Sequence, residues 1–438
     1  MKTIDRQAVI IVHGMGEQRP MDTLRSFVEG IKWQMEQNDP TEVKAKVRSK
    51  PDSIGDIYET VRLSLESNHQ AGRPITDFYE FYWAHNMRGT KFSQMGTWLT
   101  QVIFRRVSRI PAQLQRIWWT VWGIFILASV ASLACTHWLH VPGWFKPVAA
   151  VLGGAFFSMI WGSIGSFVKS SFLNSLGDVA RYMTPEPDNI AERSHIRQQG
   201  ITFLRKMHNI SNRTKPDRII VVAHSLGTAV AYDLLRLLWT EQNTVYTTPP
   251  PGNQQPMLDA VNVFARQPLT ITPNYGAFAD AQHNLWEEAQ SLGNPWLVTD
   301  FITLGAALNA IDYFMVNKVS VSKLIEQREL PVCPPETDQN DHNIFYREYL
   351  PATDAGKNRK GINVLNHGAL FAMTRWTNIF YTSDFVGGPM QRIFGLGVRD
   401  IAVKRKSLWC YPGGHTDYWA GGKNNEALKA IVEALKLS

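Results

Sequence analysis

The sequence predicts an α/β fold with a mostly parallel central sheet, interrupted by an inserted hairpin of two hydrophobic helices. Strand-like and helix-like segments alternate before and after the insertion, which is the pattern of parallel strands joined by helices. Hydrophobic residues make up 44% of the 438 residues and charged residues 19%, so the chain has enough apolar surface for a large core. This composition excludes a disordered or low-complexity protein.

Several segments have the residue pattern of core strands. Most are continuous apolar runs, which are typical of strands covered on both faces of a parallel sheet, and one is rich in aromatic residues. They comprise residues 8–12, 76–84, 217–223, 296–304, 375–381 and 399–403.

Helices are predicted between and after these strands. They comprise residues 21–37, 171–183, 189–209 and 225–239, and a last helix from about residue 425 that places Leu428, Ile431, Val432 and Leu435 on one face. Two segments without such periodicity, 247–256 and 330–342, are rich in proline or in Pro, Asp and Asn. Both are predicted to be surface loops.

Two long runs contain no Asp, Glu, Lys or Arg. Residues 117–139 and 147–168 are each long enough to cross about 30 Å of hydrocarbon as a helix. Small residues recur every fourth position of the second run, which lets helices pack closely in lipid, at Gly154, Ser158, Gly162 and Ser166. We therefore expect a transmembrane hairpin. A pair of buried core helices, or a hydrophobic cap over a site, is the alternative interpretation.

The predicted hairpin divides the chain into a first core part (1–90), an inserted module (91–170) and a second core part (171–438). Basic residues flank the hairpin, whereas its turn contains a single lysine; the flanking residues are Arg105, Arg106, Arg109, Arg116 and Lys169. Because basic flanks stay on the cytoplasmic side, we expect an inner-membrane protein with both core parts and both termini in the cytoplasm.

Charge and cysteine content restrict the partners. The net charge of +7 would suit nucleic acid, but no basic stretch interleaved with aromatic residues lies outside the membrane flank, so no nucleic-acid partner is expected. Cys135, Cys333 and Cys410 are too few and too scattered for a disulfide framework or a zinc site. The sequence therefore predicts a reducing compartment and no metal.

The strongest local motif is Val-Val-Ala-His-Ser-Leu-Gly at 221–227, between an apolar strand and an amphipathic helix. A sharp strand-to-helix turn at Ser225 would lift its hydroxyl out of the sheet as a nucleophile, and small residues are needed two positions before and after it. The usual pattern is G-x-S-x-G, and here Ala223 replaces the first glycine. The alternative is a serine that merely caps the helix.

A second glycine-rich turn, His-Gly-Met-Gly at 13–16, follows the first apolar strand. Backbone N–H groups in such a turn can stabilise a developing oxyanion. The amides of Met15 and Leu226 are the expected donors, and His13 is expected to brace the turn.

A serine nucleophile needs a base, and the base needs an orienting acid. Among the twelve histidines, His415 is the candidate base because its loop follows the 399–403 strand and precedes the last helix. Asp384, three residues after the preceding strand, is the candidate acid, with Asp417 as the alternative. His224 is expected to be structural, with its ring directed away from the serine hydroxyl.

The order Ser225, Asp384, His415, behind a strand-borne His-Gly turn, resembles the α/β-hydrolase superfamily, in particular its bacterial lipase-like and esterase-like serine hydrolases. The resemblance covers residues 1–90 and 171–438 and includes the segments IVHGMGEQRPMDTLRSF and TRWTNIFYTSDFVGG. It implies the α/β-hydrolase fold, a triad of these three residues and oxyanion amides at Met15 and Leu226. It also implies an acyl-enzyme route without metal or organic cofactor.

Together, the resemblance and the predicted hairpin indicate a membrane-anchored serine hydrolase. Because a bilayer would raise the local concentration of lipids, lipid esters are the expected substrates, in a reaction of the lipase or phospholipase A type. An esterase or thioesterase acting on soluble acyl compounds is the close alternative. A non-enzymatic membrane adaptor, built on an inactive hydrolase scaffold, is the alternative from another class.

Overall fold

The chain divides into two compact units, residues 1–87 with 183–438 and residues 88–182. The computed structural model describes residues 4–14, 19–38, 46–51, 54, 59–66, 73–87, 107, 115, 118–119, 122–123, 126–127, 130, 182–183, 187–211, 213–311, 320–350, 361–384, 386–404, 414–420 and 425–437. Every helix and strand bounded below belongs to the first unit.

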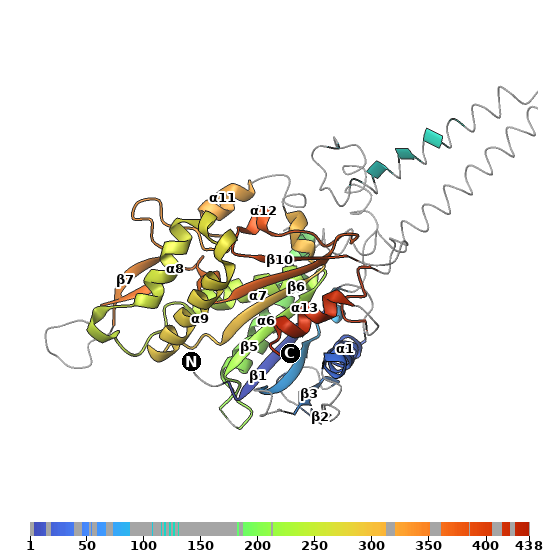
Figure 1. The fold of residues 1–438 in the computed structure, drawn as a ribbon, viewed down its shortest axis with the longest axis horizontal. Coiled ribbons are helices and arrows are strands. Elements are labelled where there is room, and N and C mark those ends of the chain that lie inside the picture. The colour runs from blue at the N-terminus through green and yellow to red at the C-terminus, as the bar shows by residue number, and fades with distance from the viewer. Residues whose placement is uncertain are drawn as a thin grey trace, which may run out of the picture. The chain divides into compact units, whose positions relative to one another are not determined.

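The core of this unit is an eight-stranded sheet in the order β10-β9-β6-β5-β1-β4-β3-β2 (Figure 1). Neighbours from β10 to β4 run parallel, whereas β3 and β2 are antiparallel, so the sheet is mixed. The strands are β1 (Arg6–Val12), β2 (Val47–Pro51), β3 (Val61–Leu65), β4 (Ile75–Phe81), β5 (Arg218–His224), β6 (Val298–Leu304), β9 (Arg375–Tyr381) and β10 (Arg399–Val403).

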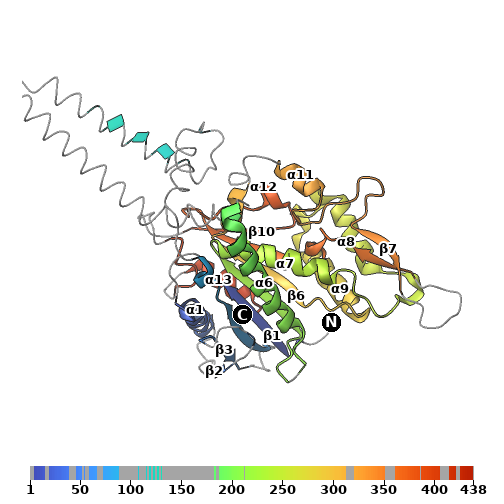
Figure 2. The same cartoon turned by 180° about the vertical axis from the view of Figure 1, so that it is seen from behind.

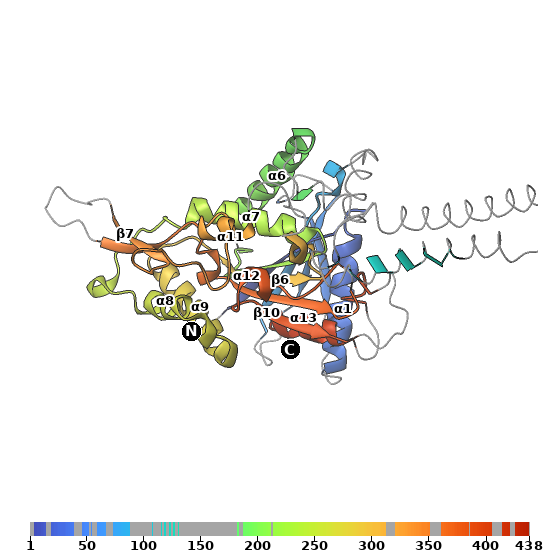
Figure 3. The same cartoon turned by 90° about the horizontal axis from the view of Figure 1, so that it is seen from above.

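Helices cover both faces of the sheet. Two of them, α1 (Asp22–Asn38) and α13 (Glu426–Ala434), pack against each other on one face, while α6 (Ile190–His208) and α7 (Gly227–Gln242) lie on the other (Figure 3). Viewed from behind, α6 crosses in front of the sheet (Figure 2).

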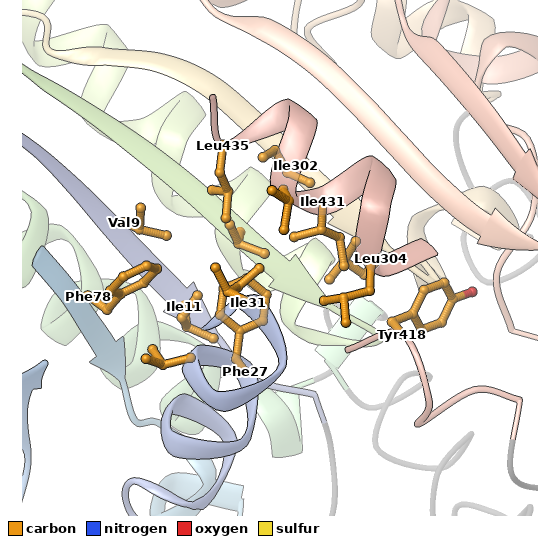
Figure 4. Close-up of a cluster of buried hydrophobic side chains, with 14 of the residues drawn as sticks. Val9, Ile11, Phe27, Ile31, Phe78, Ile302, Leu304, Tyr418, Ile431 and Leu435 are labelled. Atoms are coloured by element: carbon orange, nitrogen blue, oxygen red, sulfur yellow. The ribbon is translucent and has the colours of Figure 1, made fainter. Parts of the chain in front are cut away.

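Alternation along the strands divides the core between these two faces. Val9 and Ile11 of β1 join side chains of α1 and of the C-terminal segment in one buried cluster (Figure 4). Ile10 and Val12 point the other way and line a small cavity with residues of α6 and α7. Because neighbouring side chains of a strand face opposite sides, one apolar run supplies both halves of the core.

Further elements extend the unit beyond the sheet. They are the helices α8 (Pro256–Arg266), α9 (Tyr275–Ser291), α11 (Val321–Glu326) and α12 (Gln391–Phe394), and an antiparallel pair of strands, β7 (Phe345–Tyr349) and β8 (Gly361–Leu365). Short 3-10 helices occupy Ala84–Met87, Pro187–Asn189, Pro251–Asn253, Pro268–Thr270, Thr272–Asn274, Ala307–Ala310 and Leu370–Ala372.

The α/β arrangement predicted from the alternating pattern is present, and each predicted core strand overlaps an observed one. The surface-loop prediction for 330–342 is wrong in its first half, because Leu330, Val332 and Cys333 are buried. The helical prediction over 171–183 lies outside the described residues except at its last two positions.

The prediction of a transmembrane hairpin is corrected. Among the residues that the structure describes, no helix combines the length and the apolar character needed to cross a membrane. Apart from a few positions in the first run, 117–139 and 147–168 lie outside the described residues. A charge-free run of about twenty residues is long enough for a helix to span a bilayer. An apolar helix buried against protein can have the same length and composition.

Parallel strands place their carboxyl ends at one edge of the sheet, where ligands bind in open α/β sheets. Val12 of β1 lies opposite Ala223 of β5, and His224 lies opposite Leu304 of β6. Val403 of β10 likewise lies opposite Tyr381 of β9. The segments that follow β1, β5, β6, β9 and β10 therefore start from the same edge, and the sequence-predicted site residues all occur in such segments.

Candidate active site

Ser225 occupies a sharp turn between β5, which ends at His224, and α7, which begins at Gly227. Its backbone has a positive φ of 53°, a conformation that costs a residue with a side chain about 1–2 kcal/mol. Hydrogen bonds hold the turn in place: the Ser225 N–H donates to Leu304 O at 3.0 Å, and the Ser225 carbonyl accepts the Thr228 hydroxyl at 2.6 Å. The strained turn thus presents the serine side chain at the edge of the sheet.

Two glycines allow the chain to pack closely around this turn. A Cβ on Gly227 would lie 2.3 Å from His13 O and 2.4 Å from Val12 O, so the start of α7 touches the end of β1 backbone to backbone. A Cβ on Gly14 would lie 2.8 Å from the Ser225 Cβ. The small-residue position two before Ser225 tolerates a methyl group, because Ala223 is fully buried without disturbing the strand pairing.

Three side chains from distant parts of the chain form one hydrogen-bonded series. The Nε2 atom of His415 lies 2.8 Å from Ser225 Oγ, and Nδ1 lies 2.9 Å from Asp384 Oδ2. A carboxylate can only accept, so Nδ1 carries the ring hydrogen and Nε2 offers its lone pair to the serine hydroxyl. This is the arrangement in which an imidazole can take up a serine proton.

Asp384 is buried and held by several donors. Its Oδ2 accepts the Tyr418 hydroxyl at 2.7 Å, and its Oδ1 accepts the Val386 N–H at 2.9 Å. Burial alone would raise the pKa of Asp384, but the His415 charge and these hydrogen bonds together lower it to about 2. The group is therefore an anion through the neutral range, as an orienting acid must be.

The loop that carries His415 is fixed to several elements. The Asn425 side chain caps α13 by accepting the Leu428 N–H at 3.1 Å and donates to the Ala420 carbonyl at 2.9 Å. The Trp419 indole donates to Ser26 Oγ of α1 at 3.0 Å, and a Cβ on Gly30 would lie 2.2 Å from the Trp419 carbonyl. The base is thus supported from α1 and from the start of α13.

His13 braces the glycine turn at the end of β1. Its Nδ1 donates to Gly14 O at 2.8 Å, and its Nε2 accepts the Trp83 N–H at 3.2 Å. The Trp83 ring stacks on the imidazole with 5.3 Å between centroids. Burial lowers the pKa of His13 to about 4, so the ring is neutral, as this pair of hydrogen bonds requires.

The structure brings together the predicted serine, acid and base, and places Leu226 beside them at the N-cap of α7. Backbone N–H groups at such a terminus have no partner within the helix and favour negative charge. Met15, the other predicted oxyanion donor, lies outside the described residues. Asp417, the alternative acid, accepts the Thr416 hydroxyl at 3.4 Å, while the His415 ring is paired with Asp384.

Two residues beside the site were not assigned a part in it from the sequence. Tyr418 donates to Asp384, and His224, expected to be only structural, contacts the ring of His415 with 4.9 Å between centroids. Their nearness to His415 and Ser225 in the chain was the available signal. Among the described residues, no group of three or more His, Cys, Asp or Glu side chains is arranged to hold a metal ion.

Comparison of the chain with models of known protein families, with curated proteins and with solved structures finds no match.

Proposed function

We propose that this protein is a serine hydrolase that cleaves carboxylic esters through an acyl-enzyme. The observation that carries the proposal is the hydrogen-bonded series from Ser225 Oγ through the His415 imidazole to Asp384, with distances of 2.8 and 2.9 Å. A serine that only capped the helix would need neither the strained φ of 53° nor an imidazole on its hydroxyl.

In the proposed reaction, His415 Nε2 accepts the hydroxyl proton while Ser225 Oγ attacks the ester carbonyl carbon. The resulting imidazolium donates the proton to the leaving alkoxide, and the ester C–O bond breaks to leave an acyl-serine and an alcohol. Water, deprotonated by the same imidazole, then attacks the acyl carbon and releases the acid. Asp384 keeps the imidazole in the required tautomer and stabilises its cation.

The proposal includes the stabilisation of the oxyanion by backbone N–H groups. The amide of Leu226, at the N-terminus of α7, is one proposed donor, and the amide of Met15 after the braced His13-Gly14 turn is the other. We also propose that the chain is a member of the α/β-hydrolase superfamily. This is supported by the strand-to-helix turn at Ser225, by the chain order of Ser225, Asp384 and His415, and by the largely parallel sheet.

The proposed substrates are carboxylic esters, with no particular acid or alcohol part assigned. The expectation of lipid substrates depended on the membrane hairpin, and that prediction is corrected above. The triad chemistry is equally suited to a thioester, whose thiolate leaves in place of the alkoxide. Product analysis with short soluble esters, acyl thioesters and phospholipid vesicles separates these substrates.

Labelling with a fluorophosphonate probe tests the proposal, because the probe reacts with an activated serine. We expect wild-type protein to be labelled and Ser225→Ala to be unlabelled, with a loss of ester turnover on the order of a million-fold. The control Ser291→Ala, on the exposed end of α9, keeps both labelling and turnover. Folded wild-type protein that neither reacts with the probe nor hydrolyses esters would support the non-enzymatic alternative instead.

A further inference from the structure

His224, the last residue of β5, lies directly before Ser225 and is buried, with 6% of its surface exposed. Its Nε2 atom lies 2.7 Å from the backbone carbonyl oxygen of His415. Because a carbonyl can only accept, His224 donates this hydrogen bond and its ring hydrogen is on Nε2. The residue beside the nucleophile thus holds the backbone of the base.

The ring of His224 also packs against three residues of the loop that carries the base. Ring centroids are 4.9 Å from His415, 5.9 Å from Tyr418 and 5.0 Å from Trp419, the last in an edge-on arrangement. Tyr418 is the donor to Asp384, so the same imidazole contacts the base and a residue that orients the acid. This concentration of contacts on one short loop goes beyond what filling a core position requires.

The other ring nitrogen faces the glycine turn after β1. Nδ1 is buried, has no hydrogen-bond partner among the described residues, and would lie 3.0 Å from a Cβ on Gly14. Burial, with the neighbouring His415 charge, lowers the pKa of His224 to about 3. The ring is therefore neutral and does not repel the His415 cation that forms during the proposed reaction.

From these contacts we propose that His224 is a positioning residue for the base. It fixes the His415 backbone relative to Ser225 through the Nε2–H hydrogen bond, so that nucleophile and base share one anchor at the end of β5. The inference deepens the proposed function and rests on it. It assigns to His224 an effect on turnover, exerted through the placement of His415 and not through contact with substrate.

A matched pair of variants tests this role. Glutamine reaches as far from Cγ as the imidazole Nε2 and retains a donor, whereas methionine has similar length and no donor. We expect His224→Met to lower kcat about a hundredfold with KM within about twofold, as misplacement of a catalytic group by about 1 Å does, and His224→Gln to recover kcat to within about fivefold of wild type. His208→Met is the control, because it removes another buried imidazole–carbonyl hydrogen bond, 2.8 Å long, from α6.

Hydrogen exchange of the loop amides at 414–420 provides a readout that does not need activity. We expect faster exchange there in His224→Met, and wild-type exchange in His224→Gln and His208→Met. The inference is overturned if His224→Met keeps wild-type kcat and loop exchange, or if folded His224→Gln loses as much kcat as His224→Met. If wild-type Ser225 does not react with the fluorophosphonate probe, the proposed function fails; exchange still decides whether His224 holds the loop.

Discussion

Tyr418 donates its hydroxyl hydrogen to Asp384 Oδ2 at 2.7 Å, on the same oxygen that lies 2.9 Å from His415 Nδ1. The Tyr418 hydroxyl also accepts the Tyr381 N–H at 3.1 Å, so it links the acid to the end of β9. Asp384 thereby has a defined orientation before any substrate binds. Asp417, only two residues from His415, is bonded elsewhere.

Asp384→Asn is expected to reduce kcat by about 10³- to 10⁴-fold, because an amide no longer holds His415 in the tautomer that can accept the serine proton. The protein should stay folded, since the amide has the shape of the carboxylate. Asp417→Asn, the matched control in the same region, is expected to keep kcat within about twofold. Steady-state kinetics on a short soluble ester, with circular dichroism to verify folding, provides the comparison. The opposite ranking of the two variants would identify Asp417 as the acid.

Local patterns made the sheet edge predictable from the sequence. A continuous apolar run followed by a glycine-rich turn identified β1, and an apolar run followed by Ser225 identified the strand-to-helix turn after β5. Because parallel strands end at one edge, both turns and the segments after β9 and β10 could be assigned to the same region. The choice of Asp384 over Asp417 was also possible, since a residue two positions from His415 reaches its ring with difficulty.

Other features depended on contacts that no local pattern encodes. Tyr418 is recognisable as a donor only once β9 and the loop lie side by side, and His224 only once the His415 carbonyl is placed. The short strands β2 and β3 lack a long apolar run and were missed. The hairpin prediction depended on composition and length alone. A charge-free run of about twenty residues is long enough to span a bilayer, but the run does not by itself show that its helix does so.

Close packing between the start of α7 and the end of β1 predicts that a single added methyl group strongly destabilises the fold. In Gly227→Ala the new Cβ would lie 2.3 and 2.4 Å from two backbone oxygens of β1, which cannot move without shifting the strand. We expect destabilisation by about 3 kcal/mol or more, in the range of severe overpacking. Gly276→Ala, in the first turn of α9, is the matched control: a Cβ there meets no described atom within 4 Å, and stability should stay within about 0.5 kcal/mol of wild type. Urea unfolding measures both, and equal effects of the two variants would refute the packing argument.

Glu80 of β4 is a buried carboxyl with only part of its hydrogen-bonding capacity used. Its Oε2 accepts the Met21 N–H at 2.6 Å, just before α1, whereas Oε1 is buried and no described residue forms a hydrogen bond with it. Burial raises the pKa of Glu80 from 4.5 to about 7, with Asp22 adding to the rise and the backbone N–H groups of Met21 and Leu24 opposing it. Folding therefore favours the protonated form of this group.

The sign of the pH dependence follows from proton binding. Between pH 4.5 and 7 the folded protein holds a proton on Glu80 that the unfolded chain has released, so stability falls as the pH rises through this window. The raised pKa of Glu80 lowers the free energy of unfolding by about 3 kcal/mol between pH 4.5 and pH 8. Glu80→Gln is expected to remove this contribution. As the pH is raised from 5 to 8, the free energy of unfolding of the variant, measured with urea, should therefore increase relative to that of wild type. Glu29→Gln, which removes an exposed carboxylate of α1, should keep the wild-type dependence. An unchanged pH dependence in Glu80→Gln would show that this carboxyl is already ionised in the folded protein at pH 5.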